Sequence, residues 1–251
     1  MKALITGASS GIGADMARIL SDRGYDLILV ARRKTRLEKL KKELKTDVKI
    51  IDMDISSTFN CMELYNQIKK EDIEIVINNA GFGLFGSFCE TNLDKELDMI
   101  DLNIKALHIL TKLFVQDFKK KNTGYILNVA SSAAFLPGPL MATYYASKSY
   151  VLRLTEAISE ELKKDNSKVY IGALCPGPVE TEFNKVAKVE FNLKSLNSYD
   201  VAMYAIKKMF KRKLVIIPSA KIKIATSLTN FIPRNLKLNI AYHLQRKKGH
   251  R

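Results

Sequence analysis

The chain has 251 residues, of which 47% are hydrophobic and 27% charged, and its formal net charge is +15 at pH 7. A chain of this size can bury the core of one soluble domain, and no apolar run approaches the roughly 20 residues that span a bilayer. The basic excess is confined to one end, because residues 202–251 contain thirteen Lys or Arg and no Asp or Glu. The other 28 basic residues face 26 acidic ones, so the body needs no nucleic-acid partner to explain the charge.

Cysteine and histidine are too scattered to indicate a disulfide framework or a metal site. Cys61, Cys89 and Cys175 are odd in number and far apart, and they form no CxxC pair. The three histidines are equally dispersed, so we expect no metal. The first glycine follows Met1 too closely to leave room for the apolar region of a secretion signal. We therefore expect a cytoplasmic protein.

Seven short apolar runs alternate with longer segments of helical periodicity. The runs are nearly continuous and rich in Ile, Val and Leu, as in parallel strands buried on both faces. They cover residues 2–6, 26–31, 48–53, 73–78, 124–130, 169–175 and 213–218. Between them, apolar residues recur three and four apart in 13–24, 35–44, 58–70, 97–121 and 149–164. This alternation predicts an α/β fold, with a doubly wound parallel sheet of seven strands and helices on both faces.

A glycine-rich loop follows the first predicted strand and opens the first helix, in "LITGASSGIGADMARIL". Gly7, Gly11 and Gly13 let the backbone turn tightly and approach a pyrophosphate, whose charge is met by the helix N-terminus. An ordinary glycine turn is the alternative. The agreement of strand, loop, helix and position favours a dinucleotide site.

The second predicted strand ends in "LILVARRKTRL". An NAD site usually places an acid here, to bind the ribose 2′-hydroxyl, whereas this chain has Arg32 and Arg33 and no carboxylate to repel a 2′-phosphate. The planar guanidinium of Arg32 suits such a phosphate. A solvated basic turn is the alternative. We predict a preference for NADP(H) over NAD(H).

Tyr144 and Lys148 are four residues apart in "YYASKSY", so on a helix they lie on one face. An ammonium beside a phenol favours the phenolate and lowers a pKa that is ordinarily about 10. The spacing therefore predicts that Tyr144 is a usable acid near neutral pH.

With these residues in place, the chain resembles the short-chain dehydrogenase/reductase family in its single-domain, Rossmann-type form. The resemblance covers residues 1 to about 182 and rests on motifs in the family's order. These are "TGASSGIG" (6–13), "DMDIS" (52–56), "NNAG" (78–81), "LNIKA" (102–106), "NVASSAA" (128–134), "YYASK" (144–148) and "PGPVET" (176–181). Together they are far more specific than any one of them.

The resemblance implies a cofactor contact for most of these motifs. Asp54 would contact the adenine and Ile55 would pack on it, while Val179 and Thr181 would contact the nicotinamide carboxamide. Many NADP-preferring members carry a basic residue where this chain has Ser10, so the preference rests on the two arginines. The expected cofactor-binding residues are Gly7, Ser9, Ser10, Gly11, Ile12, Gly13, Arg32, Arg33, Asp54, Ile55, Asn79, Ala80, Gly81, Tyr144, Lys148, Pro176, Gly177, Val179 and Thr181.

Two of the catalytic residues must be chosen from adjacent pairs. The family's serine lies thirteen residues before its tyrosine, which selects Ser131 over Ser132. Ser132 should point elsewhere, since side chains alternate at the end of a strand. Tyr144, rather than Tyr145, stands four residues before Lys148.

The resemblance assigns a role to each of four catalytic residues. Tyr144 would give a proton to a carbonyl oxygen, or take it back in the reverse reaction, and Lys148 would lower its pKa and hold the nicotinamide ribose. Ser131 would hydrogen-bond the same oxygen, and Asn103 would hold a water that links the lysine to solvent. The implied activity is NADP(H)-dependent reduction of a ketone, aldehyde or 3-oxoacyl compound, or the reverse.

We expect one domain over residues 1–251, with a core at 1–200, a substrate-covering loop at about 181–200 and a basic amphipathic segment at 219–251. Phe183 and Phe191 give the loop apolar character, so the substrate is expected to be apolar in part.

The basic segment has two interpretations. Its apolar residues at helical spacing are Ile224, Leu228, Phe231, Ile232, Leu236, Ile240 and Leu244. Pro233 should divide them between two short helices. The favoured interpretation packs this stripe on the body or a partner subunit, and the alternative lays it on an anionic membrane surface.

Helices at 94–121 and 145–164 resemble those through which family members form homodimers or homotetramers. A cofactor-binding regulator or scaffold with little turnover is the alternative function, and a polyanion-binding protein is another. The presence of Ser131, Tyr144 and Lys148 together favours an enzyme.

Overall fold

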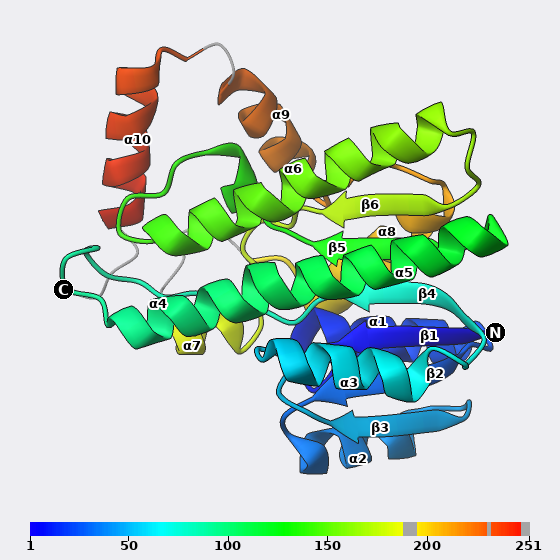
Figure 1. The fold of residues 1–251 in the computed structure, drawn as a ribbon. Coiled ribbons are helices and arrows are strands. Elements are labelled where there is room, and N and C mark those ends of the chain that lie inside the picture. The colour runs from blue at the N-terminus through cyan, green and yellow to red at the C-terminus, as the bar shows by residue number, and fades with distance from the viewer. Residues whose placement is uncertain (188–194, 230–231, 247–251) are drawn as a thin grey trace.

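The structure is a computed structural model that describes residues 1–187, 195–229 and 232–246. Its centre is a parallel sheet of seven strands in the order β3-β2-β1-β4-β5-β6-β7, as Figure 1 shows. The strands are β1 (Lys2–Thr6), β2 (Asp26–Ala31), β3 (Val48–Asp52), β4 (Ile73–Asn78), β5 (Tyr125–Val129), β6 (Tyr170–Leu174) and β7 (Val215–Ile216). Each falls within a predicted run, and the predicted fold class is confirmed.

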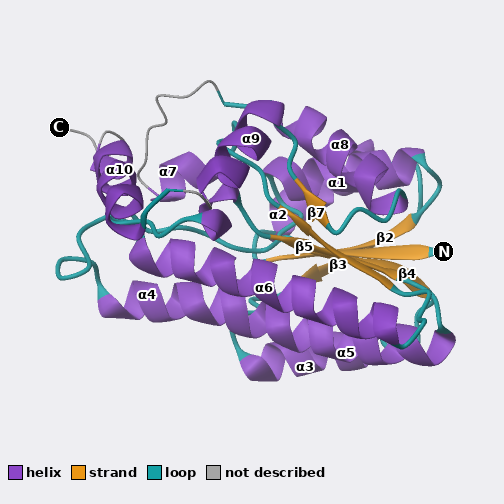
Figure 2. Ribbon diagram, turned by 90° about the horizontal axis from the view of Figure 1, so that it is seen from above, coloured by secondary structure: helices purple, strands orange, loops and turns teal. Residues whose placement is uncertain are grey.

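Helices cover both faces of the sheet. Figure 2 shows α3, α5 and α6 on one side and α1 and α8 on the other. The helices are α1 (Gly11–Asp22), α2 (Lys34–Glu43), α3 (Thr58–Ile68), α4 (Leu93–Ile100), α5 (Leu107–Lys121), α6 (Ala142–Lys164), α7 (Phe183–Ala187), α8 (Ser198–Phe210), α9 (Ala220–Leu228) and α10 (Arg234–Arg246).

The central strands are apolar without interruption because both of their faces are covered. In β1, Ile5 packs in the core beneath α1, α2 and α8, while its neighbour Leu4 packs in the core beneath α3, α5 and α6. Both side chains are fully buried. Successive side chains of a strand point to opposite faces, so each position meets one of the two cores.

A buried polar network fixes the middle of the sheet. The amide of Asn78 in β4 donates to Oδ1 of Asn128 in β5 (2.9 Å) and to Oγ1 of Thr111 in α5 (3.1 Å). Asn128 in turn donates to Oγ1 of Thr155 in α6 (3.0 Å). Each such bond contributes about 1 kcal/mol net. The network ties two strands to the helices that cover them, just before the point where those strands end.

The basic C-terminal segment folds as two helices that lie near α6 in Figure 1. The predicted break is confirmed, because Pro233 directly precedes α10. Most of the apolar stripe does not pack on the body of this chain, since Leu228 is 57% and Leu244 55% exposed, and its packing on a partner subunit stays a prediction. Ala241 and Gln245 are the buried residues of α10. Phe231 lies outside the described residues, as does Phe191 of the expected lid.

No helix within residues 1–187, 195–229 and 232–246 combines the length and the apolar character that crossing a membrane requires.

Candidate active site

A cavity of about 1380 Å³ lies where the parallel strands end. In a doubly wound sheet this edge is the usual ligand site, at the point where the strand order reverses, here between β1 and β4. All of the expected site residues line the cavity except Gly13 and Asn103, which stand behind its wall. Residues separated by more than a hundred positions in the sequence are thus brought together.

The glycine loop after β1 has the shape of a phosphate cradle. Gly7 and Gly11 have φ values of +64° and +54°, a left-handed conformation that favours glycine. A Cβ atom at Gly11 would lie 2.9 Å from Cγ2 of Thr181, so a side chain would close the loop. The Ser10 side chain makes no capping hydrogen bond to α1, which leaves the amides of its first turn for an anion. The loop fits a dinucleotide phosphate.

Gly13 has a packing role instead. A Cβ atom on it would lie 2.5 Å from Nδ2 of Asn79 and 2.6 Å from the carbonyl oxygen of Gly7. The same Nδ2 donates to the carbonyl oxygens of Thr6 (3.0 Å) and Gly7 (3.1 Å). Gly13 therefore lets α1 approach the loops after β1 and β4 closely.

The arginines after β2 form ion pairs with carboxylates, whereas the sequence predicted that no carboxylate would lie at this site. Arg32 lies 3.5 Å from the carboxylate of Asp54. Glu182 accepts hydrogen bonds from Arg33 (2.7 Å) and Arg36 (2.5 Å), and these bonds to Arg36 and Arg33 lower its pKa to about 2. Sequence reasoning missed Glu182, because it lies 149 residues from Arg33 and folding alone brings the two together.

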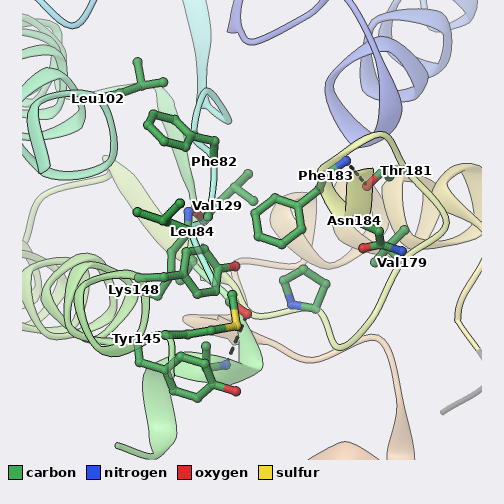
Figure 3. A pocket seen from close by; sticks show the side chains of 18 of the residues that line it. Phe82, Leu84, Leu102, Val129, Tyr145, Lys148, Val179, Thr181, Phe183 and Asn184 are labelled. Carbon is green, nitrogen blue, oxygen red and sulfur yellow. Dashed lines mark hydrogen bonds between the residues drawn. The ribbon is translucent and has the colours of Figure 1, made fainter. Parts of the chain in front are cut away.

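Tyr144 and Lys148 lie on one face at the start of α6, as predicted. Both are buried, with 8% and 5% of their surfaces exposed. Nζ of Lys148 donates to the carbonyl oxygen of Val129 (2.9 Å) and lies 5.9 Å from the centroid of the Tyr144 ring. Figure 3 shows Lys148 and Val129 among the residues that line the cavity. Ser131, two residues after β5, lies beside the Tyr144 side chain and acts to lower the pKa of that phenol.

The predicted lowering of the Tyr144 pKa is not found. Burial raises the pKa of Tyr144, and Ser131 opposes this rise only in part. Burial also lowers the pKa of Lys148 to about 8. Removing both groups from water disfavours the charged form of each, and this burial is the largest cause of both shifts.

Ser131 and Ser132 do not alternate on a strand, contrary to the prediction. The strand ends at Val129, and Ser132 begins a short 3-10 helix, Ser132–Phe135, so strand alternation does not apply. Both serines line the cavity. Ser131 has an extended backbone, and its Oγ accepts from the amide of Ala133 (3.1 Å).

Asn103 positions the loop after β4. It lies in a π-helical segment, Asp101–Ala106, between α4 and α5, and such segments are frequent at functional sites. Its Oδ1 accepts from the amide of Phe82 (3.0 Å), and its Nδ2 donates to the carbonyl oxygen of Phe82 (2.9 Å) and to Ser147 (3.2 Å). The predicted water-binding role of Asn103 stays a prediction.

Apolar side chains form the part of the cavity wall next to Tyr144 and Tyr145. Phe82, Leu84 and Phe183 project toward the space beside Tyr145 in Figure 3, and the Phe183 ring centroid is 5.3 Å from that of Tyr144. The sequence did not predict the polar residues that also line the cavity, which include Thr226, Thr229 and Gln245. Gln245 of α10 lines the cavity and donates to the hydroxyl of Tyr145.

Comparison with known proteins gives one consistent result. The model of the family "short chain dehydrogenase" matches residues 1–192. An uncharacterized oxidoreductase from Staphylococcus epidermidis is 32% identical over 213 residues, which cover 81% of this chain and 90% of that protein. A very-long-chain 3-oxoacyl-CoA reductase from Pyrenophora tritici-repentis is 34% identical over 198 residues, covering 74% of this chain but 57% of that protein.

Among solved structures, a short-chain dehydrogenase from Sphingobium yanoikuyae in complex with NADPH superposes with a TM-score of 0.81. It is 30% identical in sequence, and the match covers 93% of this chain and 96% of that one.

Proposed function

Because the chain belongs to the short-chain dehydrogenase/reductase family, we propose that it reduces a ketone, aldehyde or 3-oxoacyl compound to an alcohol with NADPH, or runs the reverse reaction. The observation that carries this proposal is the meeting of Ser131, Tyr144 and Lys148 in the cavity that also contains the glycine loop. An acid, a hydrogen-bond donor for an oxyanion and an orienting cation are thus present together.

The bound nicotinamide would supply the hydride, and the protein supplies position and protons. The raised pKa of Tyr144 keeps its hydroxyl protonated at neutral pH, ready to donate to the carbonyl oxygen. Ser131 would hold the same oxygen as negative charge develops on it. With a pKa of about 8, Lys148 is charged at neutral pH, and its charge stabilises the phenolate that proton transfer leaves.

We propose that Arg32 and Arg33 favour NADP(H) by binding the 2′-phosphate. Arg33 donates to Ser9 (3.0 Å) and Ser10 (2.9 Å), so its guanidinium lies against the glycine loop where such a cofactor would bind. A planar guanidinium matches the phosphate geometry. Glu182 competes for Arg33, so the preference depends on the phosphate displacing a carboxylate. The NADPH complex of the Sphingobium relative supports this choice of cofactor.

The substrate is proposed to be apolar in part. Phe82, Leu84 and Phe183 surround the space next to Tyr144, in an apolar cluster that also includes the buried Met141. Such a wall excludes water from the proton transfer and holds alkyl or ring groups. The name of the Pyrenophora relative is consistent with an acyl chain in this space.

The direct test follows NADPH oxidation, with NADH in parallel, against ketones, aldehydes and 3-oxoacyl thioesters. We expect at least one class to be reduced, with a higher kcat/KM for NADPH than for NADH. Tight cofactor binding with no turnover of any class would instead support a cofactor-binding regulator.

We also propose a homodimer or homotetramer that pairs through α4, α5 and α6. On α4, Leu93 is 68% and Leu97 48% exposed, and on α6 Tyr150 is 37% exposed, so these helices present apolar side chains to solvent. Light scattering on the purified protein should give a multiple of the 28.3 kDa chain mass. A monomer at micromolar concentration would contradict this assignment.

The outer faces of α9 and α10 are proposed to rest on an anionic bilayer at the cytosolic side. Leu228, Leu236 and Ile240 are 57%, 52% and 41% exposed. Residues 202–251 contain no acid, and in the described part of the chain no lysine or arginine of these helices pairs with a carboxylate. If two copies of the chain paired through α9 and α10, each would bring its lysines and arginines against those of the other. An anionic lipid surface instead neutralises these cations and takes up the apolar side chains.

Vesicle sedimentation tests this contact. The protein should bind vesicles of phosphatidylcholine with phosphatidylglycerol, but not phosphatidylcholine alone, and Leu236→Gln with Ile240→Gln should weaken binding. Phe59→Gln on α3, where the side chain is 74% exposed, is the control. Equal binding to both vesicle types, or an equal effect of the control, would contradict the proposal.

A further inference from the structure

Glu96 of α4 is a buried carboxylate that the proposed reaction does not use. Only 8% of its surface is exposed, and it stands outside the set of residues that line the cavity. Two hydroxyl groups hold it. Oγ1 of Thr143 donates to its Oε2 (2.7 Å), and Oγ1 of Thr91 donates to its Oε1. A carboxylate is costly to remove from water, so what it is bonded to in the protein indicates why it is there.

The two hydroxyl groups belong to the cavity wall and to the helix that carries the proposed acid. Thr91 lies in the loop between β4 and α4 and lines the cavity. Thr143 is the second residue of α6 and directly precedes Tyr144. In Figures 1 and 2, α4 lies beside the start of α6. One carboxylate therefore joins the wall of the cavity to the first turn of the helix that contains Tyr144.

The start of α6 lacks a side-chain cap of its own. The N-cap residue, Met141, makes no side-chain hydrogen bond to the first turn, and that turn (142–145) contains no acidic residue. The first N–H groups of a helix carry a partial positive charge, which a nearby carboxylate stabilises. Glu96 supplies this negative charge from the neighbouring helix, beside the side chain of Thr143.

The backbone that leads into α6 is strained. Leu140 has a φ of +64°, a left-handed conformation that residues with a Cβ atom rarely adopt. Its carbonyl oxygen accepts from the amide of Gly86, in the loop after β4 (2.8 Å). Such a conformation persists only where its surroundings enforce it. The bonds made by Gly86 and by Glu96 hold the same loop against the start of α6, and both oppose relaxation of this turn.

The same helix also packs near the acid. Met99, three residues after Glu96, is 1% exposed and belongs to the apolar cluster that contains Tyr144 and Tyr145. Side chains three positions apart lie on one face of a helix. One face of α4 thus packs in the surroundings of Tyr144 through Met99 and holds the start of its helix through Glu96.

We propose that Glu96 is a positioning residue, which fixes the first turn of α6 relative to the cavity wall so that the hydroxyl of Tyr144 meets the substrate carbonyl. This inference rests on the proposed reductase function. Glu96 acts through Thr143 and does not touch the substrate. Its importance for the rate follows from the precision that proton transfer needs, because a misplacement of about 1 Å can slow a reaction about 100-fold.

Kinetics of ketone reduction with NADPH test the proposal. Glu96→Leu, which removes both acceptor oxygens and leaves a side chain of similar size, should lower kcat about 10- to 100-fold. The Kd for NADPH should change little, because the glycine loop and Arg33 lie on other elements. A merely structural role would lower the melting temperature and leave the kcat of the folded protein unchanged. Asp94→Leu, at an exposed position of α4, is the matched control and should keep the wild-type kcat.

Variants of Thr143 test the same bond from its other side, and they apply even where Glu96→Leu does not fold. Thr143→Val keeps the shape of the side chain without its hydroxyl and should lower kcat, whereas Thr143→Ser keeps the hydroxyl and should retain most of it. Because both residues act through one bond, the double variant Glu96→Leu with Thr143→Val should lose no more than Glu96→Leu alone. A wild-type kcat in folded Glu96→Leu, or equal losses in Thr143→Val and Thr143→Ser, would overturn the proposal.

Hydrogen exchange separates this inference from the reductase function. In the cofactor-free protein, the amide hydrogens of residues 139–148 should exchange faster in Glu96→Leu than in wild type or in Asp94→Leu. If exchange is faster but the wild type reduces no ketone, the reductase function fails and the anchoring of α6 by Glu96 stands. If the wild type reduces ketones and Glu96→Leu exchanges and reacts as the wild type does, the role of Glu96 fails and the function stands.

Discussion

Lys148 lies one helical turn from Tyr144, with its Nζ 5.9 Å from the centroid of the tyrosine ring and both side chains buried. Burial moves the pKa values of both groups toward their neutral forms, so the phenol holds its proton and the amine releases its proton at about pH 8. The pair thus keeps an acid protonated at neutral pH beside a cation that titrates close to neutrality.

This arrangement has a cost in stability that can be measured. Replacing Lys148 by Met should raise the free energy of unfolding at pH 7 by up to about 3 kcal/mol, because the lysine pKa falls from 10.5 to about 8 on folding. Between those values the unfolded chain binds more protons than the folded one, so the wild type gains stability as pH rises. The advantage of the variant should therefore shrink between pH 8 and 10.5. Urea unfolding of the cofactor-free protein at several pH values measures this.

Lys105→Met is the matched control, since Lys105 is a solvent-accessible lysine paired with Asp101. It should change stability by less than about 1 kcal/mol, with no such trend across pH. A Lys148→Met protein less stable than wild type at pH 7 would show that the bond to Val129 outweighs the cost of burying the charge.

The pH dependence of reduction should follow the same lysine. With NADPH and a saturable ketone, kcat/KM should be level below about pH 8 and fall above it, because Lys148 loses the charge that favours the phenolate. In Lys148→Arg the guanidinium stays charged, so any remaining activity should be level to pH 10. A wild-type profile that rises through pH 8 is incompatible with this role.

Glu182 should weaken the binding of NADPH. Glu182→Gln removes the carboxylate that pairs with Arg33 and Arg36, and we expect the Kd for NADPH to fall roughly three- to fivefold, the scale of an exposed ion pair. The Kd for NADH, which lacks the phosphate, should change less. Glu180→Gln, an exposed neighbour, is the control. Equal changes for the two cofactors would separate Glu182 from the 2′-phosphate site.

Asn103 should matter for both stability and activity. Asn103→Ala leaves the amide and carbonyl groups of Phe82 without their side-chain partners, which should cost about 1–3 kcal/mol of unfolding free energy. The loop after β4 lines the cavity, so kcat should fall as well. Asn66→Ala, on the exposed face of α3, should leave both quantities near wild type. Full activity in a destabilised Asn103→Ala protein would reduce its role to packing.

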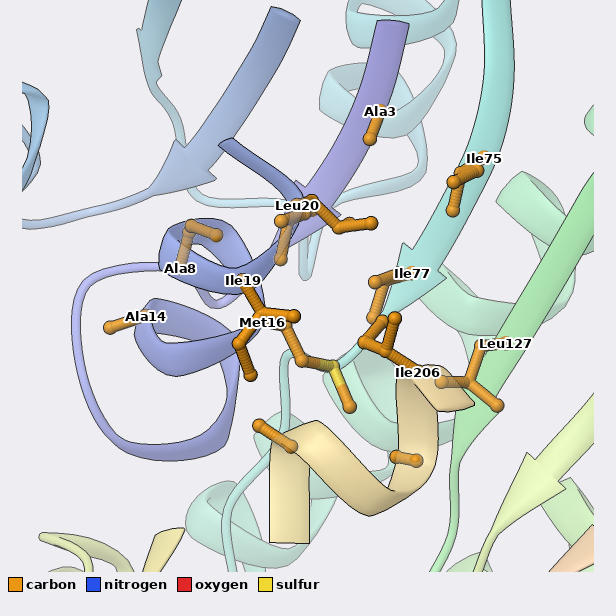
Figure 4. Close-up of a cluster of buried hydrophobic side chains, with 14 of the residues drawn as sticks. Ala3, Ala8, Ala14, Met16, Ile19, Leu20, Ile75, Ile77, Leu127 and Ile206 are labelled. Atoms are coloured by element: carbon orange, nitrogen blue, oxygen red, sulfur yellow. The ribbon is translucent and has the colours of Figure 1, made fainter. Parts of the chain in front are cut away.

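The sheet could be predicted from the sequence because each strand is a short, continuous apolar run with a local signature. Helix α8 was not predicted, although it forms much of one core. Figure 4 shows Ile206 of α8 and Met16 of α1 in one cluster with Ile77 and Leu127 of the sheet. Its sequence lies between the expected substrate-covering loop and the basic tail. Its apolar residues are recognised as a core face only once α1, against which they pack, is in place.

Only part of the candidate site could be predicted from the sequence. Gly11, Tyr144 and Lys148 belong to short motifs, whose spacing follows from the geometry of one loop or one helix. Glu182 and Gln245 reach the cavity from distant segments, and nothing local distinguishes them from solvent-exposed polar residues. The pKa of Tyr144 was predicted in the wrong direction because spacing shows the neighbouring charge but not the extent of burial.

The central claim is that Tyr144 donates the proton in a reductase, and NADPH-dependent ketone reduction by Tyr144→Phe tests it most directly. We expect kcat/KM to fall by about 10²–10⁴-fold, the usual contribution of a general acid, while NADPH still binds. Tyr199→Phe, at an exposed position of α8, should match wild type. If Tyr144→Phe reduces the same ketone within a few-fold of the wild-type rate, another group supplies the proton and this account of the site is wrong.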